Sequence, residues 1–76
     1  MQENNDAKGN VYYDVANIRI TALPNTWDDH PGIRIQAYTG EGNKLFPGAE
    51  LPIPDKETAF NLLAAIHKAI ETNENS

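Results

Sequence analysis

DKETAFNLLAAIHKAI, residues 55–70, is the stretch that decides the fold, because it predicts the helix of the chain. Asp55 is a favoured residue just before a helix, and Glu57 suits the positive end of the helix dipole. At 100° per residue, the apolar side chains gather on one continuous arc. This amphipathic helix is expected to cover a small sheet with an apolar arc made of Ala59, Phe60, Leu62, Leu63, Ile66, His67, Ala69 and Ile70.

Several segments before the helix show the alternation of β-strands. Residues 33–39 place apolar residues on one side and polar residues on the other, which makes them the clearest strand. Gly40-Glu41-Gly42-Asn43 predicts a hairpin turn that leads into a short return strand over 44–46. In segment 49–53, Pro52 lacks a backbone donor, so this segment should be an edge strand or an extended lead-in.

The segment 11–23 carries two apolar patterns of opposite phase, and the phase changes near Ala16 and Asn17. Side chains alternate faces with period two, so this change requires a turn or an extra residue. One long bulged strand would satisfy the pattern, and so would two strands, 11–15 and 17–23, joined by a tight bend. We expect the single bulged strand.

Together these elements define the predicted fold class. It is α+β, with a three- or four-stranded antiparallel meander sheet followed by one C-terminal amphipathic helix packed on one face. Residues 11–71 form the single domain. Residues 1–10 and 72–76 are polar, and we expect a disordered N-terminal arm and a disordered tail there.

The size and charge of the chain limit the classes of function that it can have. A chain of 76 residues without cysteine buries only about 60% of the surface that it exposes when unfolded, so we expect a homodimer that completes the core. The net charge of −5 argues against a general nucleic-acid binder. No apolar run approaches the ~20 residues of a membrane span, and the polar start lacks a signal-peptide pattern. We therefore expect a cytoplasmic protein with no membrane partner.

The loop before residue 33 contains the most suggestive side-chain cluster, Trp27-Asp28-Asp29-His30. Two carboxylates and an imidazole are groups that ligate metals or transfer protons. Adjacent residues point in different directions, however, and metal sites usually need about four well-separated ligands. We expect a solvated turn here, although the sequence leaves ion binding open. Trp27 covers one end of the core, acts as an exposed contact anchor, or does both.

No other residues form a predicted catalytic set or cofactor site. His67 lies in the apolar arc, where a histidine at the rim of the core is expected. A nucleophile to partner it is missing, because the chain has no cysteine and its only serine is Ser76. Gly40 and Gly42 lead into a strand, whereas a phosphate-binding loop leads into a helix. The protein is therefore expected to be non-catalytic, with no cofactor and no metal.

The sheet face opposite the isoleucines is the best functional candidate. It should gather two of the six basic residues beside a tyrosine. Such a face suits protein contacts, in which arginine and tyrosine are favoured, or stacking of nucleic-acid bases; it is also common as an ordinary polar face. We predict a small protein-interaction domain, of the regulator, adaptor or inhibitor type. It would bind a protein partner or itself through Arg19, Arg34, Gln36, Tyr38 and Trp27.

The order of elements from Ile18 to Ile70, with the turn Pro47-Gly48 before the last strand, resembles the small single-stranded-DNA-binding transcriptional coactivators. That resemblance implies a dimer with a curved sheet and a C-terminal helix. It also implies an alternative function, a dimer that binds single-stranded nucleic acid. In that family basic residues follow the Pro-Gly turn, whereas this chain has Ala49-Glu50 there. We treat the resemblance as one of element order and not as membership.

Overall fold

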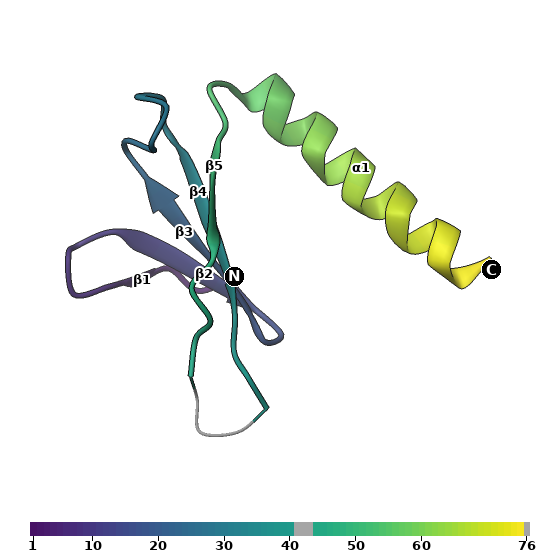
Figure 1. The fold of residues 1–76 in the computed structure, drawn as a ribbon, viewed down its shortest axis with the longest axis horizontal. Helices are drawn as coiled ribbons and strands as arrows, with labels where there is room; N and C mark the ends of the chain where they lie inside the picture. The colour runs from purple at the N-terminus through teal and green to yellow at the C-terminus, as the bar shows by residue number, and fades with distance from the viewer. Residues whose placement is uncertain (41–43, 76) are drawn as a thin grey trace.

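In the computed structural model, which describes residues 1–40 and 44–75, a five-stranded antiparallel sheet precedes one helix (Figure 1). This confirms the α+β class, with one strand more than predicted. The spatial order of the strands is their order in the chain, so the sheet is a meander. The elements are β1 (Asn4–Asn5), β2 (Val11–Val15), β3 (Ile18–Leu23), β4 (Gly32–Ala37), β5 (Ala49–Pro52) and α1 (Lys56–Glu74).

β2 and β3 are two strands joined by a tight turn, so the expected single bulged strand is wrong. Val15 pairs directly with Ile18, which leaves only Ala16 and Asn17 in the turn. Paired residues of antiparallel strands point to the same face, and this pairing explains the change of apolar phase. Ala16 adopts a positive φ of 53°, at the turn position where a type II′ turn has its glycine.

The N-terminal residues contain a short strand where the sequence predicts a disordered arm. β1 pairs with β2, and Asp6 holds the turn between them. The Oδ1 atom of Asp6 accepts hydrogen bonds from the backbone amides of Lys8, at 2.9 Å, and Asn10, at 2.8 Å. Hydrogen bonds from Asn10 and Lys8 hold the pKa of Asp6 below its usual value. The two asparagines of β1 carry no apolar pattern, so the turn chemistry is what makes this pairing possible.

Between β4 and β5 the structure contains less strand pairing than the sequence predicts. Residues 41–43 of the turn predicted at 40–43 lie outside the described residues. The predicted return strand over 44–46 is reduced to one bridge, between Tyr38 and Leu45. β5 is an edge strand, as predicted from the missing donor of Pro52.

Gly48 allows the chain to pass close to β4 just before β5 begins. A Cβ atom at this position would lie 1.7 Å from the backbone oxygen of Ile35. No side chain can be accommodated at that distance without moving the backbone. The glycine of the Pro47-Gly48 turn is therefore required by the packing of two strands.

α1 begins where the sequence predicts. The Oδ1 atom of Asp55 accepts a hydrogen bond from the backbone amide of Thr58 at 2.8 Å and so caps the helix. The helix continues to Glu74, so most of the predicted disordered tail is helical. Among the residues described, no helix combines the length and the apolar content that a membrane span requires.

α1 does not pack on the sheet, which corrects the predicted layer of helix on sheet. It projects away from the end of β5, and no described strand packs against it (Figure 1). Phe60 on the apolar arc is 69% exposed. The cause is the connector after Pro52, because Ile53 precedes Pro54 and is restricted to extended conformations. Asp55 is also extended, with φ −152° and ψ 170°, so the connector carries the helix clear of the strands.

The strand register places the sheet side chains on two faces. One face is apolar, and no described element packs on it. Leu23, 7% exposed, is the sole buried hydrophobic residue among those described. The apolar face consists of Val11, Tyr13, Val15, Ile18, Ile20, Ala22, Ile33, Ile35, Ala37, Ala49 and Leu51. The opposite face, which we call the Tyr/Arg face, includes Tyr12, Asp14, Arg19, Thr21, Arg34, Gln36, Tyr38 and Glu50.

Candidate binding surface

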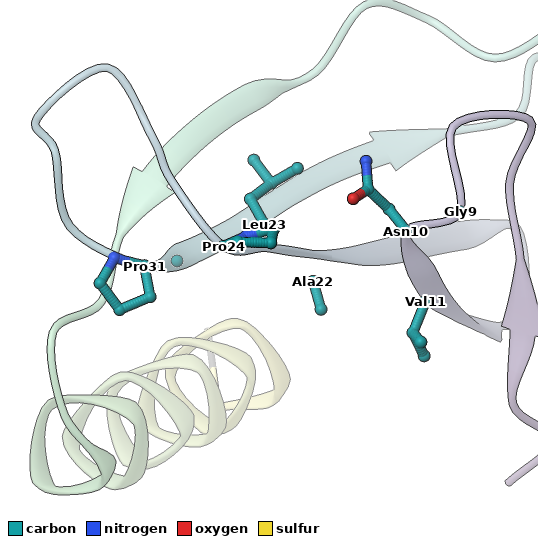
Figure 2. A pocket seen from close by; sticks show the side chains of 8 residues that line it. Gly9, Asn10, Val11, Ala22, Leu23, Pro24 and Pro31 are labelled. Atoms are coloured by element: carbon teal, nitrogen blue, oxygen red, sulfur yellow. The ribbon is translucent and has the colours of Figure 1, made fainter.

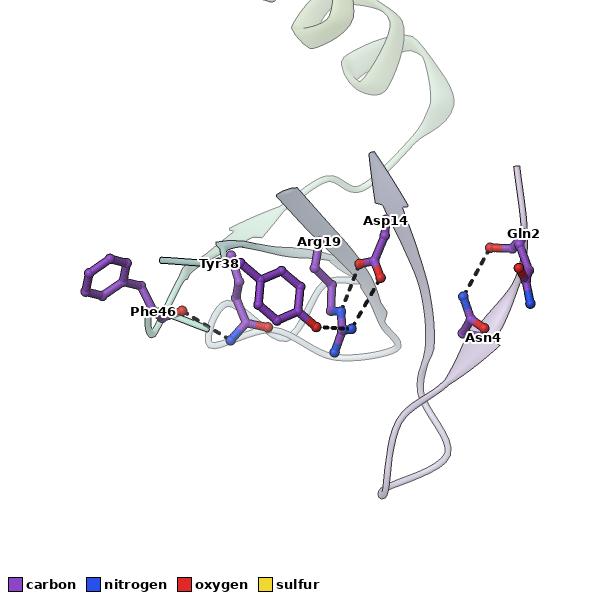
Figure 3. Close-up of polar contacts among 7 residues, drawn as sticks. Gln2, Asn4, Asp14, Arg19, Tyr38 and Phe46 are labelled. Atoms are coloured by element: carbon purple, nitrogen blue, oxygen red, sulfur yellow. Dashed lines mark hydrogen bonds and ion pairs between the residues drawn. The ribbon is translucent and has the colours of Figure 1, made fainter. Parts of the chain in front are cut away.

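The structure brings the four predicted sheet residues onto the Tyr/Arg face. Arg19 of β3 pairs with Gln36 of β4, and Thr21 pairs with Arg34 in the same ladder. Tyr38 follows β4 and reaches back over Arg19 (Figure 3). Strand pairing thus positions these side chains, as the alternation in the sequence predicts.

Arg19 is held in place by a carboxylate and two tyrosine rings. Its Nε donates to Oδ1 of Asp14 at 2.9 Å, and its Nη2 donates to Oδ2 of Asp14 at 3.3 Å (Figure 3). The same Nη2 donates to the hydroxyl of Tyr38. The guanidinium carbon lies 3.8 Å from the ring centroid of Tyr12 and 5.3 Å from that of Tyr38. The Arg19 side chain is only 17% exposed, so its position is fixed before any partner binds.

Both arginines of the face are neutralised by carboxylates. The ion pair with Asp14 raises the pKa of Arg19 above its ordinary value. Nη2 of Arg34 lies 2.9 Å from Oε2 of Glu50, across the β4–β5 pair. The Tyr/Arg face is therefore polar and aromatic, but these pairs do not make it a positive patch.

Trp27 extends the aromatic character of this face to the edge of the sheet. The indole Nε1 donates to the backbone oxygen of Glu50 at 3.3 Å, which ties the loop before β4 to β5. Trp27 is 72% exposed. The structure therefore leaves Trp27 largely outside the core, and its role as a contact anchor stays a prediction.

The predicted cluster of Asp28, Asp29 and His30 forms a turn organised by Thr26. The Thr26 hydroxyl donates to the backbone oxygen of His30 at 2.8 Å, and its amide donates to the same oxygen at 2.9 Å. Nδ1 of His30 lies 3.4 Å from Oδ2 of Asp28. Within residues 1–40 and 44–75, no three such side chains are grouped to hold a metal ion. The ring and the carboxylates instead surround a local turn, in which Asp29 has a φ of 56°.

His67 faces solvent and does not lie at the rim of a core. Its Nδ1 is 2.8 Å from Oε1 of Glu71, one helical turn later. The expected rim position required a sheet beneath α1. Because the helix stands clear of the strands, His67 is left as one half of an exposed pair.

Sequence reasoning missed three members of the face: Tyr12, Asp14 and Glu50. The signal for two of them lies in the β2–β3 turn, because a two-residue loop places Asp14 opposite Arg19 and Tyr12 opposite Thr21. Opposite charges at directly paired positions stabilise a sheet. A single bulged strand would not pair Asp14 with Arg19 or Tyr12 with Thr21. That interpretation therefore did not place Tyr12 and Asp14 on the face.

The Tyr/Arg face gathers aromatic and arginine side chains. It combines two tyrosine rings and two arginines with an exposed tryptophan at its edge. These are the residue types that dominate binding energy at protein interfaces. Comparison of the chain with protein-family models, with curated proteins and with solved structures found no match.

Proposed function

We propose that the protein is a small non-catalytic interaction domain, of the regulator, adaptor or inhibitor type, that binds a protein partner through the Tyr/Arg face. The observation that supports this most directly is the fixed position of Arg19 between the rings of Tyr12 and Tyr38. Binding costs less entropy when the contacting side chains are already ordered. Arg34 and Trp27 flank this centre and add the other favoured contact residues.

The charge pattern of the Tyr/Arg face indicates the kind of partner surface that would be complementary to it. Each arginine keeps a carboxylate beside it, so the surface offers alternating positive and negative groups around aromatic rings. A partner surface with complementary alternating charges and an apolar centre would fit such a pattern. The proposal includes a cytoplasmic location, which suits a chain without cysteine, and a homodimeric state.

The proposal is tested by the double variant Arg34→Ala/Tyr38→Ala. Tyr38→Ala also removes the hydroxyl that binds Arg19, so two arginines lose their present arrangement. The affinity for the partner captured from the native cell should fall by about 30-fold or more, the level expected for loss of dominant contact residues. The measurement is quantitative capture on immobilised wild-type and variant protein.

Lys68→Ala on α1 is the matched control, because it removes an exposed cation far along the chain from the Tyr/Arg face. It should leave capture unchanged. Circular dichroism establishes that each variant is folded. Equal capture by the double variant and the wild type would contradict the proposed function.

Single-stranded nucleic acid is the second candidate ligand, favoured by the three aromatic rings on and beside the face. Bases stack on such rings, and arginines bind phosphates. The ion pairs of Arg19 and Arg34 oppose it, since both cations already have carboxylate partners. Titration of labelled oligonucleotides at low salt should show no binding. Binding that falls steeply with salt would favour the nucleic-acid function instead.

A further inference from the structure

Residues 1–40 and 44–75 leave two apolar surfaces uncovered. One is the apolar face of the sheet, where Val15 and Ile18 are among the exposed large hydrophobic residues. The other is the apolar arc of α1, where Ile66 is 49% exposed and Ile70 is 52% exposed. The polar side of α1 is exposed as well, whereas the Tyr/Arg face of the sheet is better covered, with Thr21 only 3% exposed. Water therefore contacts the surfaces that should form the core.

The two surfaces come closest to each other at the base of α1. A hollow of about 340 Å³ at the base of α1 is lined by Ile33 of the apolar face, Ile53 of the connector and Ala59 of the apolar arc. The sheet and the helix thus form the two walls of a V-shaped opening, which we call the apolar wedge.

A second hollow continues the wedge along the sheet. It has a volume of about 390 Å³, includes Val11 and Ala22, and shares Pro31 and Gly32 with the first. Val11 and Ala22 point to the side on which α1 lies, while Leu23 points to the other side (Figure 2). The apolar lining therefore runs from the helix base towards β2.

We propose that the wedge is occupied by α1 of a second copy of this chain, in a reciprocal homodimer. Each copy supplies one helix and receives one, so the apolar arc of one chain covers the apolar face of the other. A two-fold symmetric contact of this kind closes on itself and leaves no further copy to add. This inference rests on the homodimer of the proposed function but does not depend on the Tyr/Arg face.

The exposed area matches what a stable dimer would bury. The chain exposes 6021 Å², about 1,400 Å² more than the roughly 4,600 Å² of a compact monomer of 8.4 kDa. Its radius of gyration is 13.7 Å, against about 11 Å for a compact domain of this length. Burial of that excess on both partners would give an interface of about 2,800 Å², within the range of obligate homodimers.

The connector explains why the helix of the same chain does not fill the wedge. Two prolines flank Ile53, whose backbone amide donates to the oxygen of Pro31 at 2.9 Å. This anchor and the restricted backbone hold the start of α1 away from its own sheet. Short stiff connections favour exchange of an element between identical chains over folding back.

A second copy is favoured over an unrelated helix because the wedge and its occupant are matched in one sequence. α1 is about 28 Å long and presents an apolar stripe along its length. A helix without tertiary contacts is marginally stable in water, so α1 itself needs the cover that the wedge supplies. One contact between two copies would cover both the apolar wedge and α1.

The direct test mixes isotope-labelled and unlabelled wild-type chains. Sedimentation equilibrium should show a dimer. Isotope-filtered NOE spectra should show contacts between chains that join the methyl groups of Leu63 and Ile66 to those of Ile20 and Ile35. A monomer would overturn the inference. So would a dimer in which these contacts occur only within one chain, or one that leaves the apolar face free.

Variants of the arc supply a second measurement. Leu63→Glu/Ile66→Glu should weaken the dimer at least 100-fold, because charges would enter the wedge. Ala65→Glu, outside the arc, is the matched control and should leave the dimer intact. Insertion of a flexible Gly/Ser segment between Pro54 and Asp55 should yield monomers with the helix folded back, since a long connector makes the internal contact the more accessible one. A dimer that persists unchanged in the arc variant would contradict the proposal.

The two proposals can fail separately. The Arg34→Ala/Tyr38→Ala variant alters only the Tyr/Arg face and should remain a dimer. If the wild type proves monomeric but still loses its partner on this double substitution, the wedge inference fails and the proposed binding face stands.

Discussion

At the scale of single residues, the β2–β3 turn shows how one side chain can be poorly matched to its backbone. Ala16 has a φ of 53°, in the left-handed region that alanine adopts at a cost of roughly 1–2 kcal/mol. Glycine adopts this region freely. Asn17, the other turn residue, is not among the residues with positive φ. The strain therefore sits at one position of the turn.

Ala16→Gly should raise the free energy of unfolding by about 0.5–1 kcal/mol, because relief of the strain exceeds the extra backbone entropy of glycine. Urea unfolding monitored by circular dichroism measures the change at fixed protein concentration. Asn17→Gly is the control and should leave stability unchanged or lower it. A lower midpoint for Ala16→Gly would show that the turn is not strained.

Alternation alone was enough to predict which residues of one strand share a face. Arg34, Gln36 and Tyr38 follow one strand, and their shared face could be predicted from period two. Asp14 and Glu50 could not, because they join the face through register across a turn. Register depends on loop length, which the phase change near Ala16 indicates but does not specify.

At the scale of elements, the start of α1 and the edge position of β5 were predictable from local chemistry. Asp55 has a capping side chain, and Pro52 lacks an amide. The direction of α1 was not predictable, because it depends on the backbone angles of a short connector. β1 was missed for the opposite reason, since two asparagines carry no apolar signal and gain their pairing from the turn at Asp6.

Helix content should fall at low pH through loss of the α1 cap. The hydrogen bond from the amide of Thr58 lowers the pKa of Asp55 below 3.8. A carboxylate with a lowered pKa stabilises the fold above its unfolded value, and this stabilisation disappears as the pH falls through the folded value. The loss should therefore occur below pH 3.8 and appear as reduced ellipticity at 222 nm.

Asp55→Asn separates this effect from other carboxylates. Asparagine still accepts a hydrogen bond at the helix start but does not titrate. The variant should keep its helix content at neutral pH and lose the part of the acid transition that belongs to the cap. Identical acid transitions for wild type and variant would show that Asp55 does not contribute to it.

At the scale of the whole molecule, the distribution of burial is inverted relative to an ordinary small domain. The buried positions, Thr21, Leu23 and Thr26, lie on or beside the polar face, while the isoleucines of the other face are only partly covered. A single chain in this arrangement gains little from the hydrophobic effect. Its stability should therefore depend on what covers the apolar wedge.

Thermal unfolding should accordingly depend on protein concentration. For a dimer that unfolds to separate chains, each tenfold rise in concentration adds about 1.4 kcal/mol and should raise Tm by roughly 3–6 °C. Differential scanning calorimetry over two decades of concentration measures this. A Tm that is independent of concentration would indicate that one chain is stable alone.

The meander order of the sheet has a consequence for synthesis of the chain. Each strand pairs with the one made immediately before it, so the sheet requires no contact with residues still to be translated. α1 is made last and touches none of the strands. A nascent chain can thus form its sheet before the helix that would cover its apolar face has been synthesised. Until that helix is available, the exposed apolar face makes the partly synthesised chain prone to aggregation.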